Sequence, residues 1–291
     1  MDITKAIASK DDNIIRKSNP NRFWIPKGNP VSMLNSDRIP PFNQPWIIGH
    51  RGYRAKYPEN TLAAFQAAIA AGARMIELDV ALSRDRHLVV IHDATLERTT
   101  NGHGLVADFT LAELKHLDAG SWFQAKFADQ RLPELSEVLD IAKGRAFVNI
   151  EIKSHAYEPH HPPDAIEKQV VALVKQKKIA DTVLISSFDG NILKQLSCLA
   201  SAPALALISK TPADKHTKEF CTRIKAFSWH PNHKILTRRQ VAGMQAVGLK
   251  VFPYNVDTFE DYQMMIDMKV DGVIASDPIL TRQWSRIRKA A

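Results

Sequence analysis

Residues 75–93 read MIELDVALSRDRHLVVIHD, two apolar runs separated by the polar residues 83–87. The first run has the length of a buried strand, and period-two alternation places Glu77 and Asp79 on the face opposite Leu78. Burying a carboxylate costs on the order of several kcal/mol unless cations or hydrogen bonds replace the lost water. The pair therefore indicates a metal ion or a basic partner on that face, with a solvated strand end as the alternative.

The short polar segment between the two runs decides how the strands connect. A parallel crossover needs about a dozen residues, so a connection of this length predicts an antiparallel hairpin. Pairing Leu82 with Leu88 also pairs Leu78 with His92. This register places the imidazole beside the two carboxylates.

The rest of the chain alternates apolar runs with amphipathic segments, a pattern that predicts parallel strands joined by right-handed helical crossovers. Strands are expected at 46–50, 75–82, 146–152, 183–187, 204–208, 226–229, 250–255 and 272–275, and helices at 62–71, 135–143, 165–178, 190–199, 237–247 and 258–268. Eight such units within about 250 residues predict an α/β fold, the (β/α)8 TIM barrel.

Two segments lie outside this repeat. Residues 1–45 are rich in Pro, Asn and Ser and are expected to form an irregular extension. Residues 94 to about 131 carry turn residues and short amphipathic pieces. They predict a small insertion after the second strand, over the barrel mouth, where loops carry function in this fold. The barrel domain is expected to span 46–285.

Composition narrows the class of protein further. Lys and Arg exceed Asp and Glu by 39 − 31 = 8, and the excess is spread along the chain. This favours small anionic ligands and argues against a nucleic-acid surface. Cys198 and Cys221 lack metal-ligand spacing and are expected to be reduced and buried. The sequence contains no apolar signal segment or membrane span, so a soluble cytoplasmic protein is expected.

Barrel enzymes place functional side chains at the carboxyl ends of their strands. Seven ionisable residues lie at such positions here: His50, Arg51, Glu77, Asp79, His92, Glu151 and Lys153. The three acids form an all-oxygen set that suits Ca²⁺ or Mg²⁺ better than zinc. The two cations suit a phosphate, and the two histidines suit acid–base chemistry near neutral pH. The alternatives are a structural strand-end histidine and an ordinary ion pair of Glu151 with Lys153.

The remaining histidines have no comparable neighbours in the sequence. They are expected on the surface or in loops, where His155 and the pair at 160–161 lie close enough to Lys153 to line a rim. This group comprises His103, His116, His155, His160, His161, His216, His230 and His233.

The order of short motifs along the chain resembles the glycerophosphodiester phosphodiesterase family, relatives of the phosphatidylinositol-specific phospholipases C. The matching pieces are HRG at 50–52, PENT at 58–61, ELDV at 77–80, HD at 92–93, LERTTNG at 96–102, LP at 132–133, EIK at 151–153 and DGVI at 271–274. The resemblance implies a TIM barrel with an insertion after the second strand. It also implies a divalent metal held by Glu77, Asp79 and Glu151, with His50 and His92 as the acid–base pair.

The same resemblance implies that Arg51 and Lys153 contact the phosphate of the substrate. The chain departs from the family at 254–257, where YNVD replaces the usual Trp-Thr-Val-Asn. Tyr254 is therefore expected to form an altered aromatic wall of the pocket. Phe188 and Trp229 are further candidates for this wall, with core packing as the alternative.

The expected activity is metal-dependent hydrolysis of a small glycerophosphodiester to sn-glycerol 3-phosphate and an alcohol. Either histidine can be the base, and the nucleophile is water or the substrate's own hydroxyl. One alternative is a lysophospholipase D whose insertion shelters an acyl chain with Trp122, Phe123 and Phe127. Another is a non-catalytic barrel that only binds phosphodiesters.

Overall fold

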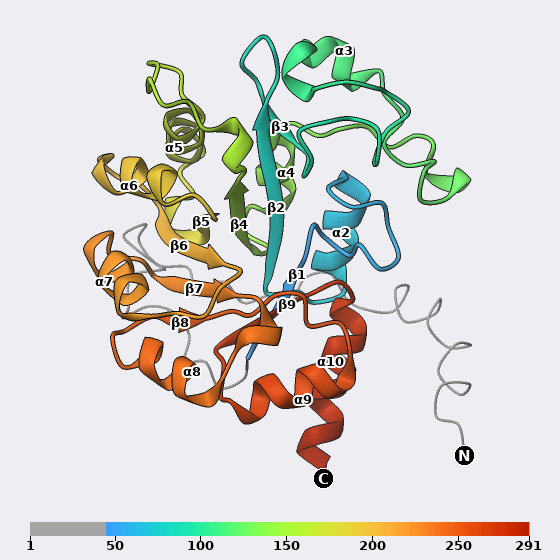
Figure 1. Ribbon diagram of the computed structural model, residues 1–291. Coiled ribbons are helices and arrows are strands. Elements are labelled where there is room, and N and C mark those ends of the chain that lie inside the picture. Colours follow the sequence, from blue (N-terminus) through green and yellow to red (C-terminus); the bar gives the residue numbers. More distant parts are fainter. Residues whose placement is uncertain (1–44, 291) are drawn as a thin grey trace.

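The computed structural model describes residues 45–290, so the predicted extension lies outside the described residues but for Pro45. Helices surround a barrel of mostly parallel strands (Figure 1). The strands are β1 (Trp46–Gly49), β2 (Met75–Leu82), β3 (Leu88–Val90), β4 (Phe147–Ile152), β5 (Val183–Ser187), β6 (Ala204–Ser209), β7 (Ser228–Pro231), β8 (Lys250–Val251) and β9 (Gly272–Ala275). The predicted (β/α)8 TIM barrel is confirmed.

The strands follow the order β8-β7-β6-β5-β4-β2-β1-β9, and each neighbouring pair in this path is parallel. Beyond the short β8, Tyr254 forms a parallel bridge to Ile274 of β9, which brings the two ends of the path together. The strand predicted at 250–255 is interrupted because Pro253 has no N–H to donate to a sheet. All carboxyl strand ends therefore meet at one mouth.

Strand β3 forms the antiparallel hairpin with β2 that the short connection predicts. Leu82 pairs with Leu88, as expected, and the Ile91 N–H donates to the Asp79 carbonyl at 3.1 Å. His92, the next residue after Ile91, therefore lies opposite Leu78. The predicted register is confirmed.

The insertion begins and ends at neighbouring points of this hairpin. Val90 N–H donates to the Pro133 carbonyl at 2.8 Å, and Val89 forms a bridge to Glu134. Within the insertion, Leu96, Val106, Leu114, Ala119 and Leu132 pack with Ala81, Val89 and Ile91 as a separate apolar cluster. The insertion therefore has its own small core beside the barrel mouth.

The helices lie outside the barrel (Figure 1). They are α2 (Leu62–Ala70), α3 (Leu111–Lys115), α4 (Leu135–Ala142), α5 (Ile166–Lys177), α6 (Gly190–Cys198), α7 (Lys215–Arg223), α8 (Arg238–Gln245), α9 (Phe259–Asp267) and α10 (Pro278–Ala290). The predicted six are present, but α3, α7 and α10 are additions. Helix α7 fully buries only Cys221, with Phe220 partly buried beside it, so its apolar pattern in the sequence is weak.

Two apolar layers hold this architecture together. Inside the barrel, rings and aliphatic side chains from alternating strand positions fill the end opposite the mouth, where the Trp46 and Phe147 rings lie 5.0 Å apart. Between strands and helices, two larger clusters pack the outer faces. Cys221 is buried as predicted, whereas the burial predicted for Cys198 is wrong because it ends α6 on the solvent side. Within residues 45–290, no helix is both long and apolar enough to cross a membrane.

Candidate active site

The turn after β1 fixes the first two candidate residues. Arg51 adopts a left-handed φ of 51°, and its N–H donates to Glu77 Oε2 at 2.8 Å. Gly52 follows with a φ of 84°, and a Cβ there would lie 2.6 Å from the Ala64 backbone. Only glycine permits this close approach to α2. The turn thereby holds His50 and Arg51 against the acids of β2.

The three predicted acids come together at the mouth. Asp79 pairs with Glu151 in the ladder between β2 and β4, and Glu77 lies one interior position earlier on β2. All three are buried, and one carboxylate oxygen from each lies within 4.8 Å of the others. This is the one cluster of its kind in the part of the chain that the structure describes.

Burial and mutual repulsion disfavour the charged forms of two of these acids. Burial raises the pKa of Glu77 well above its ordinary value, and the charges of Asp79 and Glu151 raise it further. Burial and Asp79 raise the pKa of Glu151 to about 7. Oxygen ligands of concentrated negative charge fit a hard divalent cation, so the residues present match the predicted metal site.

Two cations and one amide already contact Asp79. Lys153 Nζ lies 3.2 Å from Asp79 Oδ1 and 2.6 Å from Glu151 Oε1, while Arg51 Nε lies 3.3 Å from Asp79 Oδ2. Asn60 Nδ2 donates to Asp79 Oδ2 at 2.9 Å. Burial acts to raise the pKa of Asp79, but Lys153 and Arg51 outweigh it and lower that pKa. Asp79 is therefore the ionised centre of the cluster.

The two candidate histidines differ in their surroundings. His50 is buried, and its Nε2 lies 3.9 Å from Glu77 Oε2. Burial lowers the pKa of His50 well below its ordinary value, and Arg54 and Arg51 lower it further. His92 is partly exposed, and its Nδ1 lies 2.5 Å from Asp93 Oδ1. Burial also lowers the pKa of His92. Both imidazoles are therefore held neutral near pH 7.

Glu59 lies in the PENT motif and Arg98 in the LERTTNG motif, and the sequence predicted no role for either residue. Arg98 donates from Nε to Asp93 at 2.5 Å and from Nη2 to Glu59 at 2.8 Å. Glu59 in turn accepts from Arg51 Nη1 at 2.7 Å. These ion pairs connect His92, through its partner Asp93, to Arg51. The insertion is thereby linked to the charged residues of the mouth.

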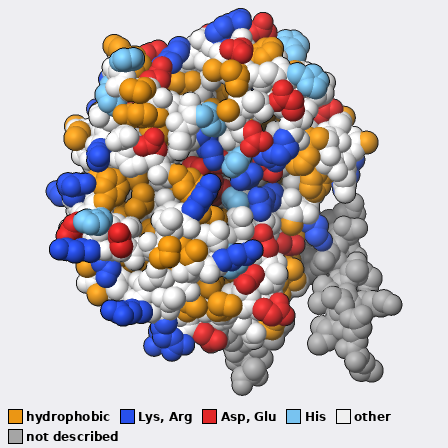
Figure 2. Space-filling model, in the orientation of Figure 1, with side chains coloured by type: hydrophobic (Ala, Val, Ile, Leu, Met, Phe, Trp, Pro, Cys, Tyr) orange, Lys and Arg blue, Asp and Glu red, His pale blue; other side chains and the backbone are white. Residues whose placement is uncertain are grey.

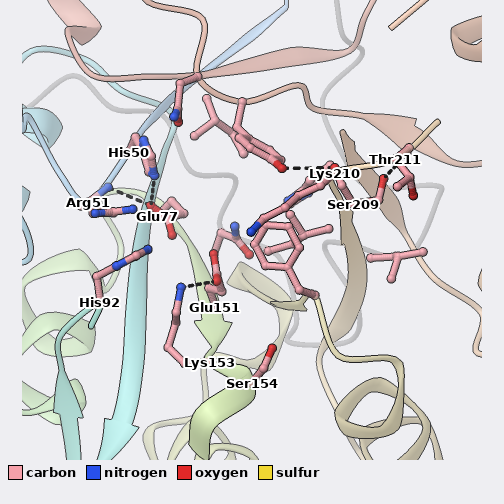
Figure 3. A pocket seen from close by; sticks show the side chains of 18 of the residues that line it. His50, Arg51, Glu77, His92, Glu151, Lys153, Ser154, Ser209, Lys210 and Thr211 are labelled. Carbon is pink, nitrogen blue, oxygen red and sulfur yellow. Dashed lines mark hydrogen bonds and ion pairs between the residues drawn. The ribbon is translucent and has the colours of Figure 1, made fainter. Parts of the chain in front are cut away.

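We use the name charged wall for the predicted charged residues on one side of the cavity. Six of them line it, namely His50, Arg51, Glu77, His92, Glu151 and Lys153, and Asp79 is buried in contact with Arg51 and Lys153. The cavity has a volume of about 840 Å³. Figure 2 shows the hollow, where basic and histidine side chains surround acidic ones. Figure 3 shows the side chains of His50, Arg51, Glu77, His92, Glu151 and Lys153 converging from the ends of β1, β2, β3 and β4.

We use the name opposite wall for the facing residues Phe188, Lys210, His230, Tyr254 and Asn255 from the β5 to β8 side. Phe188 and Tyr254 line the cavity as predicted, with ring centroids 6.1 Å apart at 82°. Trp229 does not reach the cavity. It is fully buried between strands and helices, where its Nε1 donates to Ser209 Oγ at 2.8 Å.

The placement of His230 on the surface or in a loop is wrong, because it lies on β7 with its side chain fully buried. Its Nε2 lies 2.9 Å from Ser228 Oγ, and burial lowers the pKa of His230 to about 3. Within the described chain, His230 Nδ1, Asn149 Oδ1 and Asn255 Oδ1 have no hydrogen-bond partner. All three residues line the cavity, and we call them the polar floor. Two of them, His230 and Asn255, are also part of the opposite wall.

The aromatic residues of the insertion lie elsewhere. Phe127 packs against Tyr57 at 5.5 Å and against Phe123 at 5.9 Å, and Trp122 contacts Phe123 in turn. None of the three insertion aromatics lines the described cavity. They form a cluster of their own, which gives no support to an acyl-chain shelter.

A charged mouth with two cations on a closed parallel barrel is typical of a TIM-barrel enzyme that binds a phosphate group. The sequence model of the glycerophosphoryl diester phosphodiesterase family matches residues 50–280, and the chain belongs to this family. It is an enzyme of the phosphoric diester hydrolase class, as the resemblance implied.

Relatives with this name are similar over most of their length. The chain is 42% identical over 233 residues to a glycerophosphodiester phosphodiesterase of Caldanaerobacter subterraneus subsp. tengcongensis, covering 80% of this chain and 94% of that one. It is 36% identical to a glycerophosphodiester phosphodiesterase of Bacillus altitudinis, covering 80% and 94%.

Solved structures show the same fold. A phosphodiesterase of Oleispira antarctica in complex with the product sn-glycerol-3-phosphate superposes with a TM-score of 0.76 at 28% identity, covering 82% of this chain and 96% of that one. A glycerophosphodiester phosphodiesterase from Agrobacterium tumefaciens gives a TM-score of 0.71 at 30% identity, covering 82% and 99%.

Proposed function

We propose that this enzyme hydrolyses glycerophosphodiesters to sn-glycerol 3-phosphate and an alcohol, with a divalent cation held by Glu77, Asp79 and Glu151. The observation that carries the proposal is the buried acidic cluster, which lies beside two phosphate-binding cations at the mouth. Ca²⁺ and Mg²⁺ are the cations that suit this all-oxygen set. When bound, such a cation supplies charge stabilisation for the phosphoryl oxygens.

Arg51 and Lys153 bind the other phosphoryl oxygens in this scheme. Arg51 presents a planar guanidinium whose position is fixed by its ion pairs with Glu59 and Asp79. Lys153 adds a point charge from β4's end, between Asp79 and Glu151. Both cations are therefore held in place before the substrate arrives, which lowers the reorganisation needed in the transition state.

His50 and His92 exchange protons with the reacting oxygens. One accepts a proton from the nucleophile, which is either water or the neighbouring glycerol hydroxyl, as the new P–O bond forms; attack by the hydroxyl gives a cyclic phosphate, which water then opens to sn-glycerol 3-phosphate. The other donates a proton to the leaving alkoxide as the old P–O bond breaks. Asp93 occupies Nδ1 of His92, so Nε2 is the atom available for this transfer. Lowered pKa values leave either ring able to act as the base near neutral pH, and the ring that acts as the acid must first take up a proton.

The test is product release as a function of metal. Purified full-length enzyme is stripped with a chelator, supplied with Ca²⁺ or Mg²⁺, and assayed for glycerol 3-phosphate with glycerophosphocholine, glycerophosphoethanolamine and glycerophosphoinositol. We expect activity only after metal is restored, and almost none in Glu77→Gln. Glu113→Gln, which alters an exposed acid of the insertion, is the matched control. Release of no glycerol 3-phosphate from any of these diesters would contradict the proposal.

The same assay separates the lysophospholipase D alternative. Because the insertion aromatics do not line the cavity, deacylated diesters should be cleaved faster than the corresponding lysophospholipids. Faster cleavage of the acylated forms would favour the alternative.

A further inference from the structure

Lys210 is the residue of the opposite wall that sequence reasoning did not single out. It follows the last residue of β6, and its Nζ lies 5.3 Å from the centroid of the Phe188 ring. It lines the cavity, and Figure 3 shows its side chain extending across the mouth toward Glu151. An ammonium group over an aromatic face is held there by cation–π attraction.

The backbone beneath Lys210 is anchored on both sides. The Tyr254 hydroxyl donates to the Ser209 carbonyl at 3.2 Å, and Ser209 Oγ donates to the Thr211 carbonyl at 3.1 Å. Trp229 Nε1 donates to the same Ser209 hydroxyl. The loop therefore presents Lys210 to the cavity from a fixed base.

Lys210 also differs from the other cations of the cavity in its charge balance. Arg51 and Lys153 each contact two carboxylates. No carboxylate lies within ion-pair distance of Lys210 in the described range 45–290, so its charge is available to a ligand. The side chain is exposed to the cavity solvent, which leaves it free to follow that ligand.

The level of Lys210 in the barrel indicates which part of a substrate it meets. Ile208 of β6 pairs with His230 of the polar floor, and Lys210 lies two residues nearer the mouth. The polar floor offers uncharged donors and acceptors, which suit the hydroxyl groups of glycerol. With the glycerol end on the floor and the phosphate on the charged wall, the remaining alcohol extends toward Lys210.

We propose that Lys210 makes this enzyme prefer glycerophosphodiesters whose leaving alcohol carries an additional anionic group, and disfavour those with a quaternary ammonium group. The inference rests on the proposed function and deepens it. A quaternary ammonium is recognised by an open aromatic face. Here the face of Phe188 is occupied by a cation of the same sign, whereas an anion gains a charge-assisted contact.

The experiment compares substrates that differ by one charged group. Catalytic efficiency is measured with glycerophosphoinositol 4-phosphate, glycerophosphoinositol and glycerophosphocholine. For the wild-type enzyme we expect the phosphorylated substrate to be favoured over its neutral counterpart, and choline to be poorest. In Lys210→Met this preference should fall by about tenfold, whereas Lys210→Arg should retain it. Lys194→Met, which removes an exposed lysine of α6 outside the cavity, is the matched control.

The outcomes separate the competing explanations. An equal loss with all three substrates would mean that Lys210 contacts the scissile phosphate or supports the loop, and would overturn the proposal. Unchanged ratios in Lys210→Met would also overturn it. An active wild-type enzyme without charge preference contradicts only this inference, whereas a wild-type enzyme inactive on every diester contradicts the proposed function itself. Raised salt should weaken the wild-type preference and leave that of Lys210→Met unchanged.

Discussion

On the charged wall Arg51 and Lys153 each contact two carboxylates, whereas on the opposite wall Lys210 lies over an aromatic ring and no carboxylate of residues 45–290 is within ion-pair distance of it. Arg51 and Lys153 form buried ion pairs with Asp79, and removing one partner of such a pair costs about 3–5 kcal/mol. Lys210 has no such partner among the described residues, and its replacement breaks only an exposed ring contact. Substitution of Arg51 or Lys153 should therefore cost far more folding stability than substitution of Lys210.

This difference assigns different tasks to the two walls. In the proposed mechanism, the charged wall contacts the part that every phosphodiester shares, which is the phosphate with its reacting oxygens. The opposite wall meets the groups that vary between substrates. Changes on the charged wall should therefore affect all substrates, and changes on the opposite wall should affect selectivity or stability.

The largest effect is expected for His92→Ala on the charged wall. Loss of proton transfer should lower turnover by about 10²- to 10⁴-fold, and added metal should not restore it. His87→Ala, which removes an exposed histidine of the same hairpin, is the control and should stay active. Near-normal turnover of His92→Ala, or its recovery with metal, would show that His92 is not an acid–base residue.

For Asp79→Asn we expect a smaller effect, and on metal affinity rather than on proton transfer. Apparent metal affinity should fall on the order of 10- to 100-fold because a charged oxygen ligand is lost, and excess metal should partly restore turnover. Metal titrations of activity measure this, with Asp108→Asn in the exposed part of the insertion as the control. An Asp79→Asn enzyme with an unaltered metal titration would remove Asp79 from the ligand set.

The smallest effect concerns stability and the opposite wall. Burial lowers the pKa of His230 to about 3 from an ordinary value of 6.5, so the unfolded chain binds a proton that the folded chain excludes. The contribution of His230 to the free energy of unfolding is fully present above pH 6.5. It falls by about 1.4 kcal/mol per pH unit as the pH drops below that value. His230→Gln should show a shallower loss of unfolding free energy between pH 7 and 5.

Denaturant unfolding at several pH values measures that slope. His216→Gln, an exposed histidine of α7, should match the wild type. If His230→Gln and the wild type lose stability in parallel, then His230 does not control this part of the pH dependence.

The charged wall could be predicted because its positions follow from short-range rules. Alternation places Glu77 and Asp79 on one face, parallel topology brings Glu151 beside them, and hairpin pairing fixes His92. These rules need only the residues of each strand and its neighbour. The resemblance to a known family added the roles of the residues.

The opposite wall was largely beyond sequence reasoning because its geometry depends on distant contacts. Lys210 faces the cavity through a loop anchored by Tyr254, which lies 45 residues away from Ser209 in the chain. His230 reads as one histidine among many until β7 places it inside the barrel. Helix α7 was not predicted because its sequence is mostly polar: it begins with a capping box at Asp214, and Phe220 and Cys221 are the residues that pack against the core.

The two junctions between the insertion and the barrel have a consequence for engineering. Because Val90 bonds to Pro133, the chain leaves the barrel and returns to it at adjacent points, and the segment between them closes its own loop. Exposed turns of such a segment tolerate changes in length, whereas its apolar residues must be kept because they cover Ala81, Val89 and Ile91 of the hairpin. The first few residues after His92 are the exception, since Asp93 and Arg98 connect the imidazole to Glu59. An added segment for a new partner therefore belongs in an exposed turn after Asn101, where it keeps both this connection and the apolar cluster of Val106, Leu114 and Ala119.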